Sequence, residues 1–297
     1  ASLAFFPDPA HEGPGVRIAE IIDGGPLQAA GTKIRVGTII EAIDGREIAA
    51  GANWYPQLNR KAGRPVRLSL AAADGGARWQ ETVKPVSLGD ESELLYQRWV
   101  RSRRALVERL SGGRLGYAHI RSMSDSRYRE IFEDIFGKAV DKEGIVLDTR
   151  FNNGGNLVEA LTVLLTGTTY ARAVPRGQYL GEESVHRWTK PSVVVMNEGN
   201  YSDAHCFPMA YEALDIGTTV GMQVPGTCTS VWWETLQDRS LTFGIPMVGY
   251  LDNDGELMEN QHLEPDVEVD NDPALEAGGR DQQLEKAVEV LLAAIDG

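Results

Sequence analysis

The sequence predicts an α/β protein with a mainly parallel sheet, preceded by a small β-rich domain. The first observation is that short apolar strands and turn signals fill the chain up to about Leu88. The second is that buried strands and helices alternate from Leu115 onward, with loops of about two to six residues between them. Such alternation is typical of parallel sheets. The 297 residues are about twice the length of a typical domain, which agrees with two domains.

Residues 1–88 are predicted to form the β-rich domain. The first long strand ends at the turn Asp23-Gly24-Gly25-Pro26. Asp44-Gly45 is a hairpin turn between two further strands, and a second hairpin crosses Asp74-Gly75-Gly76. We expect a small, partly open barrel. Two short helices complete it, over 26–30 and 53–62.

Residues 89–114 are predicted to be a linker, built on a helix over 91–110 that ends at Ser111-Gly112-Gly113. Residues 115–297 then form the α/β core. Its strands are expected at 115–120, 144–148, 192–196 and from 220, its helices at 126–139, 157–165, 202–214 and 281–294, and a β-hairpin region at 231–252.

Composition and charge exclude several classes of protein. With 42% hydrophobic and 24% charged residues, the chain is neither disordered nor fibrous. A net charge of −14 argues against binding to nucleic acid or to an anionic membrane surface. No apolar run approaches the roughly 20 residues of a spanning helix, so we expect no membrane insertion. The five histidines and two cysteines show no metal-ligand spacing, and we expect no metal or other cofactor.

Two polar loops follow buried strands of the predicted parallel sheet, where open α/β sheets place their active sites. The loop over 148–156 contains Gly154 and Gly155, whose position lets backbone N–H groups face an anion or oxyanion. The loop over 197–204 places Ser202 at the start of a helix. Taken alone, Ser202 is more typical of a helix N-cap, and the glycines of an ordinary tight turn.

The β-rich segment resembles a PDZ domain. The resemblance rests on Gly37, the stretch Ile40-Glu41-Ala42-Ile43-Asp44-Gly45, and the helix and hairpin that follow. It implies a groove that captures an extended peptide by strand addition. The usual loop that binds a peptide's terminal carboxylate is absent, and Gly13-Pro14-Gly15-Val16 is the segment most similar to it in sequence. A small barrel without a peptide function is the alternative.

The two loops together resemble the S41 serine peptidases, whose catalytic core is of the ClpP/crotonase type. One unit is a strand followed by Asp-x-Arg-x-Asn-x-Gly-Gly from Asp148, and the other is a strand followed by Asn-Glu-x-x-x-Ser from Asn197. The processing-peptidase branch has a Lys about 25 residues after the Ser, where this chain has Thr227. The chain instead resembles the tricorn branch over nearly its whole length. The segments that support this are 45–53, 96–100, 116–120, 148–152, 197–203 and 259–268.

This resemblance implies a role for each residue of the candidate site. Ser202 would be the nucleophile, and Gly155 and Asp203 would supply the backbone N–H donors of the oxyanion hole. Gly154 would support the turn. Glu259 would match the family's Glu, which orients the catalytic base through a bridging hydroxyl. A Ser hydroxyl is a weak nucleophile without an adjacent base, so the position of the base decides the activity.

In the family the base is a His, preceded by a Ser, that lies N-terminal to the PDZ domain. No such pair occurs here, and we expect the base upstream of this chain, which as a fragment would then be inactive or nearly so. His205 and His262 are the alternative bases, while His11 lies in an unlike Pro/Gly-rich context. Ala173 stands where the family has an acidic residue, which puts a basic P1 preference in doubt.

The expected function is therefore that of a tricorn-like serine endopeptidase acting on peptides or unfolded proteins. The alternatives are a catalytically inactive peptide-binding module and a crotonase-like acyl-CoA enzyme. The resemblance implies a homo-oligomer, a trimer or a trimer-based hexamer. Cys206 and Cys228 form either a disulfide across the loop over the active site or two separate buried thiols. The compartment is open, with a periplasmic or secreted location favoured over a cytoplasmic one.

Overall fold

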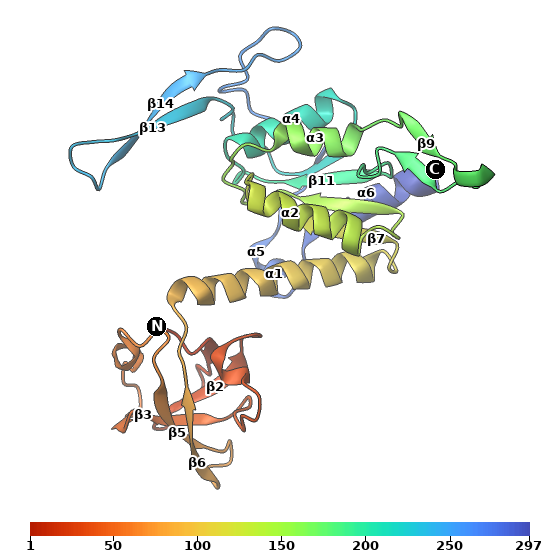
Figure 1. The fold of residues 1–297 in the computed structure, drawn as a ribbon. Helices are drawn as coiled ribbons and strands as arrows, with labels where there is room; N and C mark the ends of the chain where they lie inside the picture. Colours follow the sequence, from red (N-terminus) through yellow and green to blue (C-terminus); the bar gives the residue numbers. More distant parts are fainter. The chain divides into compact units, whose positions relative to one another are not determined.

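The computed structural model describes all 297 residues, and they divide into two compact units, Ala1–Ser102 and Arg103–Gly297. Helix α1, Leu88–Leu110, begins in the first unit and ends in the second (Figure 1). The division therefore falls inside this helix rather than at either of its ends. No helix combines the length and the apolar character that crossing a membrane requires.

The first unit is built on one antiparallel sheet, which confirms the predicted β-rich region. Its order is β1-β2-β3-β5-β6, and β4 pairs with β3 across the Asp44-Gly45 turn. Alternate residues of β5, among them Leu68 and Leu70, are buried in the core of the unit. The strands are β1 Phe5–Pro7, β2 Val16–Ile21, β3 Ile39–Ile43, β4 Arg46–Glu47, β5 Val66–Ala71 and β6 Arg78–Val83.

The two helices expected here are shorter than predicted. The first is the 3-10 turn η1, Pro26–Gln28, and the second is only η2, Tyr55–Leu58. Trp54 explains the second difference, because its ring stacks on Phe5 and on Tyr55 and so ties this segment to β1 instead of to a helix. Tertiary packing of one aromatic residue thus overrides the local helix signal.

The glycine segment that stands nearest to a carboxylate loop has a packing role in the structure. The N–H of Gly15 donates to the Ile48 carbonyl at 2.8 Å, so this amide is already used. A Cβ at Gly15 would lie 2.6 Å from the side chain of Ile39, and its φ is +83°. Only glycine allows this close approach to β3.

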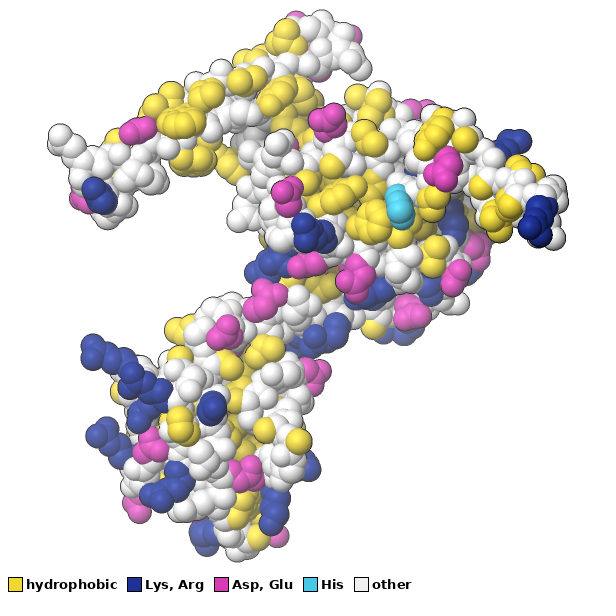
Figure 2. All heavy atoms as spheres, in the orientation of Figure 1, with side chains coloured by type: hydrophobic (Ala, Val, Ile, Leu, Met, Phe, Trp, Pro, Cys, Tyr) yellow, Lys and Arg dark blue, Asp and Glu magenta, His cyan; other side chains and the backbone are white.

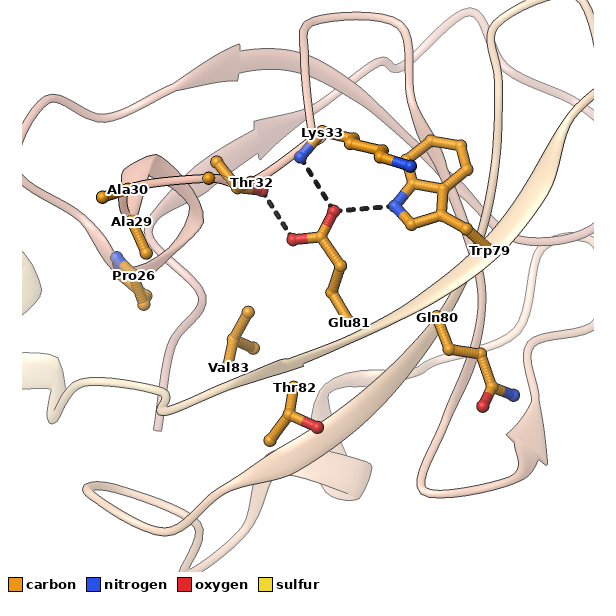
Figure 3. Close-up of a pocket in the computed structure, with 11 residues that line it drawn as sticks. Pro26, Ala29, Ala30, Thr32, Lys33, Trp79, Gln80, Glu81, Thr82 and Val83 are labelled. Atoms are coloured by element: carbon orange, nitrogen blue, oxygen red, sulfur yellow. Dashed lines mark hydrogen bonds between the residues drawn. The ribbon is translucent and has the colours of Figure 1, made fainter.

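A hollow of about 330 Å³ lies between edge strand β6 and the loop over 26–33 (Figure 3). The carboxylate of Glu81 crosses it and accepts hydrogen bonds from Thr32 Oγ1 at 2.7 Å, from the Lys33 N–H at 2.9 Å and from Trp79 Nε1 at 2.7 Å. Burial raises the pKa of Glu81, but these three donors outweigh it and lower the pKa. Glu81 therefore acts as an anchor that fastens the loop to the sheet.

The second unit contains a five-stranded sheet in which every pair is parallel, in the order β15-β12-β11-β8-β7. This confirms the predicted α/β class. The strands are β7 Leu115–His119, β8 Gly144–Asp148, β11 Ser192–Met196, β12 Thr218–Gly221 and β15 Val267–Glu268.

Helices cover both faces of this sheet. Inward residues such as Leu147 and Met196 pack with α2, α3 and α4, whereas α6 packs on β8, β11 and β12. The expected helix over 126–139 is α2, Asp125–Glu133, followed by a single π-helical turn, η3, Asp134–Lys138. The remaining helices are α3 Val158–Thr166, α4 Asp203–Ala213, α5 Pro273–Ala277 and α6 Gln282–Asp296.

Two β-ribbons lie outside the sheet, at opposite ends of the second unit (Figure 1). The predicted hairpin region contains β13, Ser230–Thr235, and β14, Thr242–Val248. The other ribbon, not predicted, pairs β9, Ala171–Ala173, with β10, Gly181–Glu183, and includes the 3-10 turn η4, Pro175–Gly177.

Candidate active site

The two candidate loops leave the carboxyl ends of neighbouring strands, β8 and β11, and hydrogen bonds join them. The Tyr201 N–H donates to the Asn152 carbonyl at 2.9 Å. The Asn200 side chain donates to Thr149 Oγ1 at 2.8 Å. Asn152 and Asn200 are both buried, so these bonds are shielded from water. The sequence thus places the two loops against each other through its asparagines.

Ser202 has a strained backbone, with φ +56° and ψ −124°, immediately before α4. Its side chain makes no capping hydrogen bond, so the N-cap interpretation is not supported by the geometry. Its N–H donates instead to Thr227 Oγ1 at 2.9 Å. This contact fixes the turn from outside the helix and leaves the hydroxyl of Ser202 free to face solvent or a substrate.

The two glycines of the first loop fit where no other residue would. A Cβ on Gly154, which has φ +88°, would lie 2.6 Å from Ser202 Cβ and 3.0 Å from the Asp203 nitrogen. A Cβ on Gly155, which has φ +145°, would lie 1.9 Å from the Met123 carbonyl oxygen. The glycine loop therefore packs directly against the turn that contains Ser202.

Two backbone N–H groups flank Ser202 without a hydrogen-bond partner in the chain, those of Gly155 and Asp203. Asp203 lies at the start of α4, where the helix dipole favours negative charge. The Asp203 carboxylate accepts from the Leu157 N–H at 2.6 Å. Burial raises the pKa of this carboxyl group, although bonds from backbone N–H groups oppose the rise. The Asp203 side chain thus holds the glycine loop while its own N–H stays available.

A cavity of about 810 Å³ opens beside Ser202. Gly155, Ser202 and Asp203 form part of its wall, so the free N–H groups and the hydroxyl share one space. The other walls come from α3, α4 and the segments around 229 and 251. They include Glu159, Met209, Thr229, Ser230, Tyr250, Leu251, Asp252 and Met258. The volume is that of a typical site for a small molecule or a peptide side chain.

Glu259 is half-buried and lies on the segment that packs against the Thr227 loop. The neighbouring Asn260 N–H donates to the Gly226 carbonyl at 3.0 Å, and a Cβ on Gly226 would lie 2.4 Å from the Gln261 nitrogen. Glu259 Oε2 is buried and has no hydrogen-bond partner. A buried carboxylate oxygen without a donor is costly, so this oxygen requires a partner that the described chain does not supply.

None of the candidate histidines bonds to the Ser202 hydroxyl. His205 is buried, and its Nδ1 accepts from the Thr227 N–H at 3.2 Å. Its ring therefore holds the loop that supports Ser202. His262 has an exposed ring whose Nδ1 lies 2.8 Å from Gln223 Oε1. His11 contacts the Pro14 carbonyl within the first unit. The structure therefore does not support His205 or His262 as a substitute base.

The neutral form of His205 is favoured by its surroundings. Burial lowers its pKa, and the backbone of Gln261 and the charge of Glu259 only partly oppose this. Because Nδ1 accepts a hydrogen bond, the proton of the neutral ring is on Nε2, which is buried without a partner. The charge of Glu259, whose Oε2 has no donor, thus acts on the ring of His205.

Cys206 and Cys228 form a disulfide, with their Cα atoms 5.5 Å apart. This confirms the bridge and excludes two separate thiols. Both residues line the cavity, so the bridge ties the first turn of α4 to the loop that contains Thr227. Ala173, at the position where the family has an acidic residue, lies on the exposed strand β9 and does not line this cavity.

Sequence reasoning missed the support beneath the glycine loop. Arg150 is fully buried and bonds Asp148 at 2.7 and 2.9 Å, Asp281 at 3.0 Å and Gln283 at 3.0 Å. Tyr117 donates to the Asp148 carboxylate at 2.9 Å. Burial raises the pKa of Asp148, but the charge of Arg150 outweighs it and lowers the pKa. The sequence did contain a signal for this support, because Asp148 and Arg150 are a pair of opposite charges at the end of an apolar strand.

The family model described as peptidase family S41 matches residues 114–269, which is more than half of the chain. The chain therefore belongs to peptidase family S41. A second model, described as the tricorn protease PDZ domain, matches residues 18–87. Within the family the chain is tricorn-like, as the PDZ model and the curated relatives agree.

Tricorn protease homolog 1 of Streptomyces coelicolor is 34% identical over 272 residues, which are 91% of this chain and 25% of the relative. Tricorn protease of Thermoplasma acidophilum is 27% identical over 257 residues, which are 86% of this chain and 24% of the relative. The crystal structure of the tricorn protease has the same fold, with a TM-score of 0.84 at 24% identity over 99% of this chain and 29% of that chain. The chain spans about a quarter of the length of the curated relatives it matches.

Proposed function

We propose that this chain is the PDZ-like and catalytic part of a tricorn-like serine endopeptidase that hydrolyses peptides or unfolded proteins through an acyl-enzyme on Ser202. The observation that carries the proposal is the strained Ser202 beside two unpartnered N–H donors in one cavity. Family membership supports the reaction class. An acyl-CoA reaction has less support, because it does not require a strained Ser in this position.

In the proposed reaction Ser202 Oγ attacks the scissile carbonyl carbon while its proton passes to a base. The carbonyl oxygen becomes an oxyanion, and the N–H groups of Gly155 and Asp203 stabilise it by about 3–4 kcal/mol per donor. The C–N bond then breaks, and the base returns the proton to the leaving amine. Water hydrolyses the resulting ester and regenerates the hydroxyl. Gly154 keeps the turn compact enough for both donors to reach one oxygen.

The base in this proposal is a His outside these 297 residues. Its support is that no His of the chain bonds to Ser202 Oγ. Glu259 would receive a hydroxyl that bridges to this His, which would satisfy the unpartnered Oε2. The chain alone is then expected to hydrolyse peptides several orders of magnitude more slowly than the full-length protein. Comparable rates would place the base within the chain.

The proposal has three further parts. The PDZ-like unit would capture an extended chain by strand addition. The protein would assemble as a homo-oligomer, a trimer or a hexamer built from trimers. The disulfide supports an oxidising compartment, and hence a periplasmic or secreted location over a cytoplasmic one.

A serine-directed fluorophosphonate tests the nucleophile in the full-length protein. Ser202→Ala should remove labelling and lower peptide hydrolysis more than about 100-fold, while the melting temperature changes by only a few degrees. Ser230→Ala is the matched control, because Ser230 lines the same cavity, and it should keep both signals.

Labelling that persists in Ser202→Ala would remove Ser202 from the role. The second candidate function is a catalytically inactive peptide-binding module, which is favoured by the absence of a His hydrogen-bonded to Ser202 Oγ. An unlabelled full-length protein that still binds peptides would support this second function.

A further inference from the structure

Two hydrogen bonds in series connect the ring of His205 to the backbone of Ser202. His205 lies in the first turn of α4, three residues after Ser202. The Thr227 N–H donates to His205 Nδ1 at 3.2 Å. Thr227 Oγ1 in turn accepts from the Ser202 N–H at 2.9 Å. His205 thus acts on Ser202 through one intermediate residue, which uses its backbone for the ring and its hydroxyl for the turn of Ser202.

The Thr227 loop is fastened on both sides of this residue. The carbonyl of Gly226 accepts from the Asn260 N–H at 3.0 Å. Cys228 is held by the disulfide to α4. The bond to His205 lies between these two attachments, so it sets the position of Thr227 within a loop that is already held in place. Loss of this one bond therefore moves Thr227 locally and leaves the fold of the unit intact.

The bond between Thr227 and His205 requires the neutral ring. A backbone N–H only donates, so Nδ1 must be unprotonated to accept from it. Protonation of the ring would place an N–H on Nδ1, facing the N–H of Thr227, and two donors cannot pair. A buried donor without an acceptor costs free energy, so the protonated ring favours a loop that has moved away. The charge of one ring therefore decides where Thr227 lies.

Ser202 depends on Thr227 because its backbone is strained. It is a residue other than glycine at φ +56°, and such a conformation persists only where the surroundings hold it. The Thr227 hydroxyl lies 3.4 Å from the Pro225 carbonyl, to which it donates, and this leaves its oxygen free to accept from Ser202. When Thr227 moves, the turn relaxes. The Ser202 hydroxyl then leaves its place beside the N–H groups of Gly155 and Asp203.

The surroundings of the ring determine where it titrates. The titratable groups on α4 and on the elements packed against it are Asp203, Tyr211, Glu212, Glu159, Glu259 and His262. Burial lowers the pKa of His205, the backbone of Gln261 and the charge of Glu259 raise it, and the charge of His262 lowers it. The Thr227 loop adds no titratable group, because its cysteine is bridged. Burial has the largest effect, so the neutral ring is the stable form at neutral pH.

The ring is also screened from solvent. Charged side chains are scattered over the surface of the second unit in Figure 2, and histidine is sparse on the face that the figure shows. The side chain of His205 is fully buried. It therefore takes up a proton from water only when the Thr227 loop opens, and by linkage the proton stabilises the open loop.

We propose that neutral His205 positions Ser202 through Thr227, and that acid reversibly breaks this contact and switches the site off. His205 is then a positioning residue, distinct from the base that takes the proton of Ser202. The effect on peptide hydrolysis rests on the proposed function, whereas the opening of the loop does not.

Nitrogen NMR of the 297-residue chain, with isotopically labelled histidine and threonine, tests the opening without catalysis or any variant. At about pH 7.5, Nδ1 of His205 should be unprotonated and Nε2 protonated. On acidification the Thr227 amide signal should shift with the same midpoint as the ring, below about 6.5, and should return when the pH is restored. A constant Thr227 signal while the ring titrates would overturn the proposal, and so would a protonated Nδ1 at about pH 7.5.

Matched variants identify the ring that is responsible. In His205→Asn the Thr227 amide should no longer shift with pH, because the Asn oxygen, attached to Cγ as Nδ1 is, accepts a hydrogen bond but does not titrate in this range. His186→Asn is the control, because His186 lies in the same unit and packs against Phe132 and Phe136. This variant should titrate as the wild type does. A shift that survives in His205→Asn would exclude His205 as its cause.

Peptide hydrolysis by the full-length protein tests the effect on Ser202. Thr227→Val should lower kcat at least about 10-fold with little change in KM, because it misplaces the nucleophile and not the substrate, and Thr227→Ser should restore most of the loss. His205→Leu should also lower kcat. Combined with Thr227→Val it should cause no further loss, because the two residues act in series.

The acid limb of the pH profile separates His205 from the catalytic base. Below the midpoint of His205, log kcat/KM should fall with a slope of about two in the wild type, where two groups must be unprotonated, and of about one in His205→Asn. Equal slopes, or losses that add in the double variant, would overturn the proposal. A full-length protein without peptidase activity would refute the proposed function instead, and the NMR result would then decide the proposal by itself.

Discussion

Removing the bridge between Cys206 and Cys228 should destabilise the second unit by an amount that follows from its loop. The two residues are 22 apart in the sequence, and closing a loop of that length contributes about 3 kcal/mol in the chain-entropy description. For a unit of roughly 200 residues, this corresponds to a fall of about 6–12 °C in the melting temperature.

The assay is thermal unfolding followed by circular dichroism, with and without reductant. The double variant Cys206→Ala, Cys228→Ala should melt at the lower temperature in both conditions, because it has no bridge to lose. The wild type should match the variant only when it is reduced. Unfolded and unreduced wild type should show no free thiol. Fluorophosphonate labelling of Ser202 should slow in parallel, because the bridge holds the loop whose Thr227 accepts the Ser202 N–H.

Two results would refute this reasoning. If the reduced and oxidised wild type melt within about 2 °C of each other, the loop is held by its other contacts and not by the bridge. If two thiols per chain titrate without reductant, the bridge does not form in the isolated protein.

Three further changes test the site. Gly155→Ala should destabilise the second unit by about 3 kcal/mol in urea unfolding and abolish fluorophosphonate labelling of Ser202, because the new Cβ would lie 1.9 Å from a backbone carbonyl oxygen. Unchanged labelling would contradict the requirement for glycine at this position. Arg150→Met should cost about 3–5 kcal/mol, because it removes the ion-pair partner of the buried Asp148 and leaves Asp281 with only Arg103, whose Nε lies 3.5 Å away. Arg280→Met on the exposed surface should change the stability much less. Burial lowers the pKa of His205 in the folded state, so on acidification the unfolded chain takes up a proton at His205 before the folded chain does. The wild type therefore loses stability as the pH falls below about 6.5. His205→Gln should reduce the fall in melting temperature between about pH 7.5 and about pH 5.5. An equal fall in the variant and the wild type would contradict the assignment.

The fold could be predicted where the signals are local. The Asp-Gly hairpin and the apolar strands of the parallel sheet follow from residues that are neighbours in the sequence. The prediction of a helix over 53–62 was wrong, because Trp54 packs on a strand almost fifty residues earlier in the chain. A local sequence pattern does not indicate such a contact. Strands β9 and β10 escaped prediction because each has only three residues and no apolar alternation.

The candidate site divides in the same way. Gly154, Gly155 and Ser202 could be singled out because each lies in a short loop directly after a buried strand, and the structure brings these loops together. The role of Thr227 could not be predicted, because its partner is distant in sequence, and the pair of Asp148 and Arg150 gave no sign of Asp281 and Gln283, which lie more than 130 residues later. Thr227 acts on a residue 25 positions earlier, and its hydroxyl has no distinguishing context of its own.

The buried Arg150 has a consequence for how the protein is made. It lies at the foot of the glycine loop, yet one of the carboxylates that neutralise it belongs to Asp281, 131 residues later. On the ribosome, the whole sheet is synthesised before this partner exists. Until Asp281 leaves the exit tunnel, Arg150 has only part of its hydrogen bonding, and the loop above it lacks its anchor. The glycine loop thus lacks one of the two charged anchors beneath it until residue 281 has been translated.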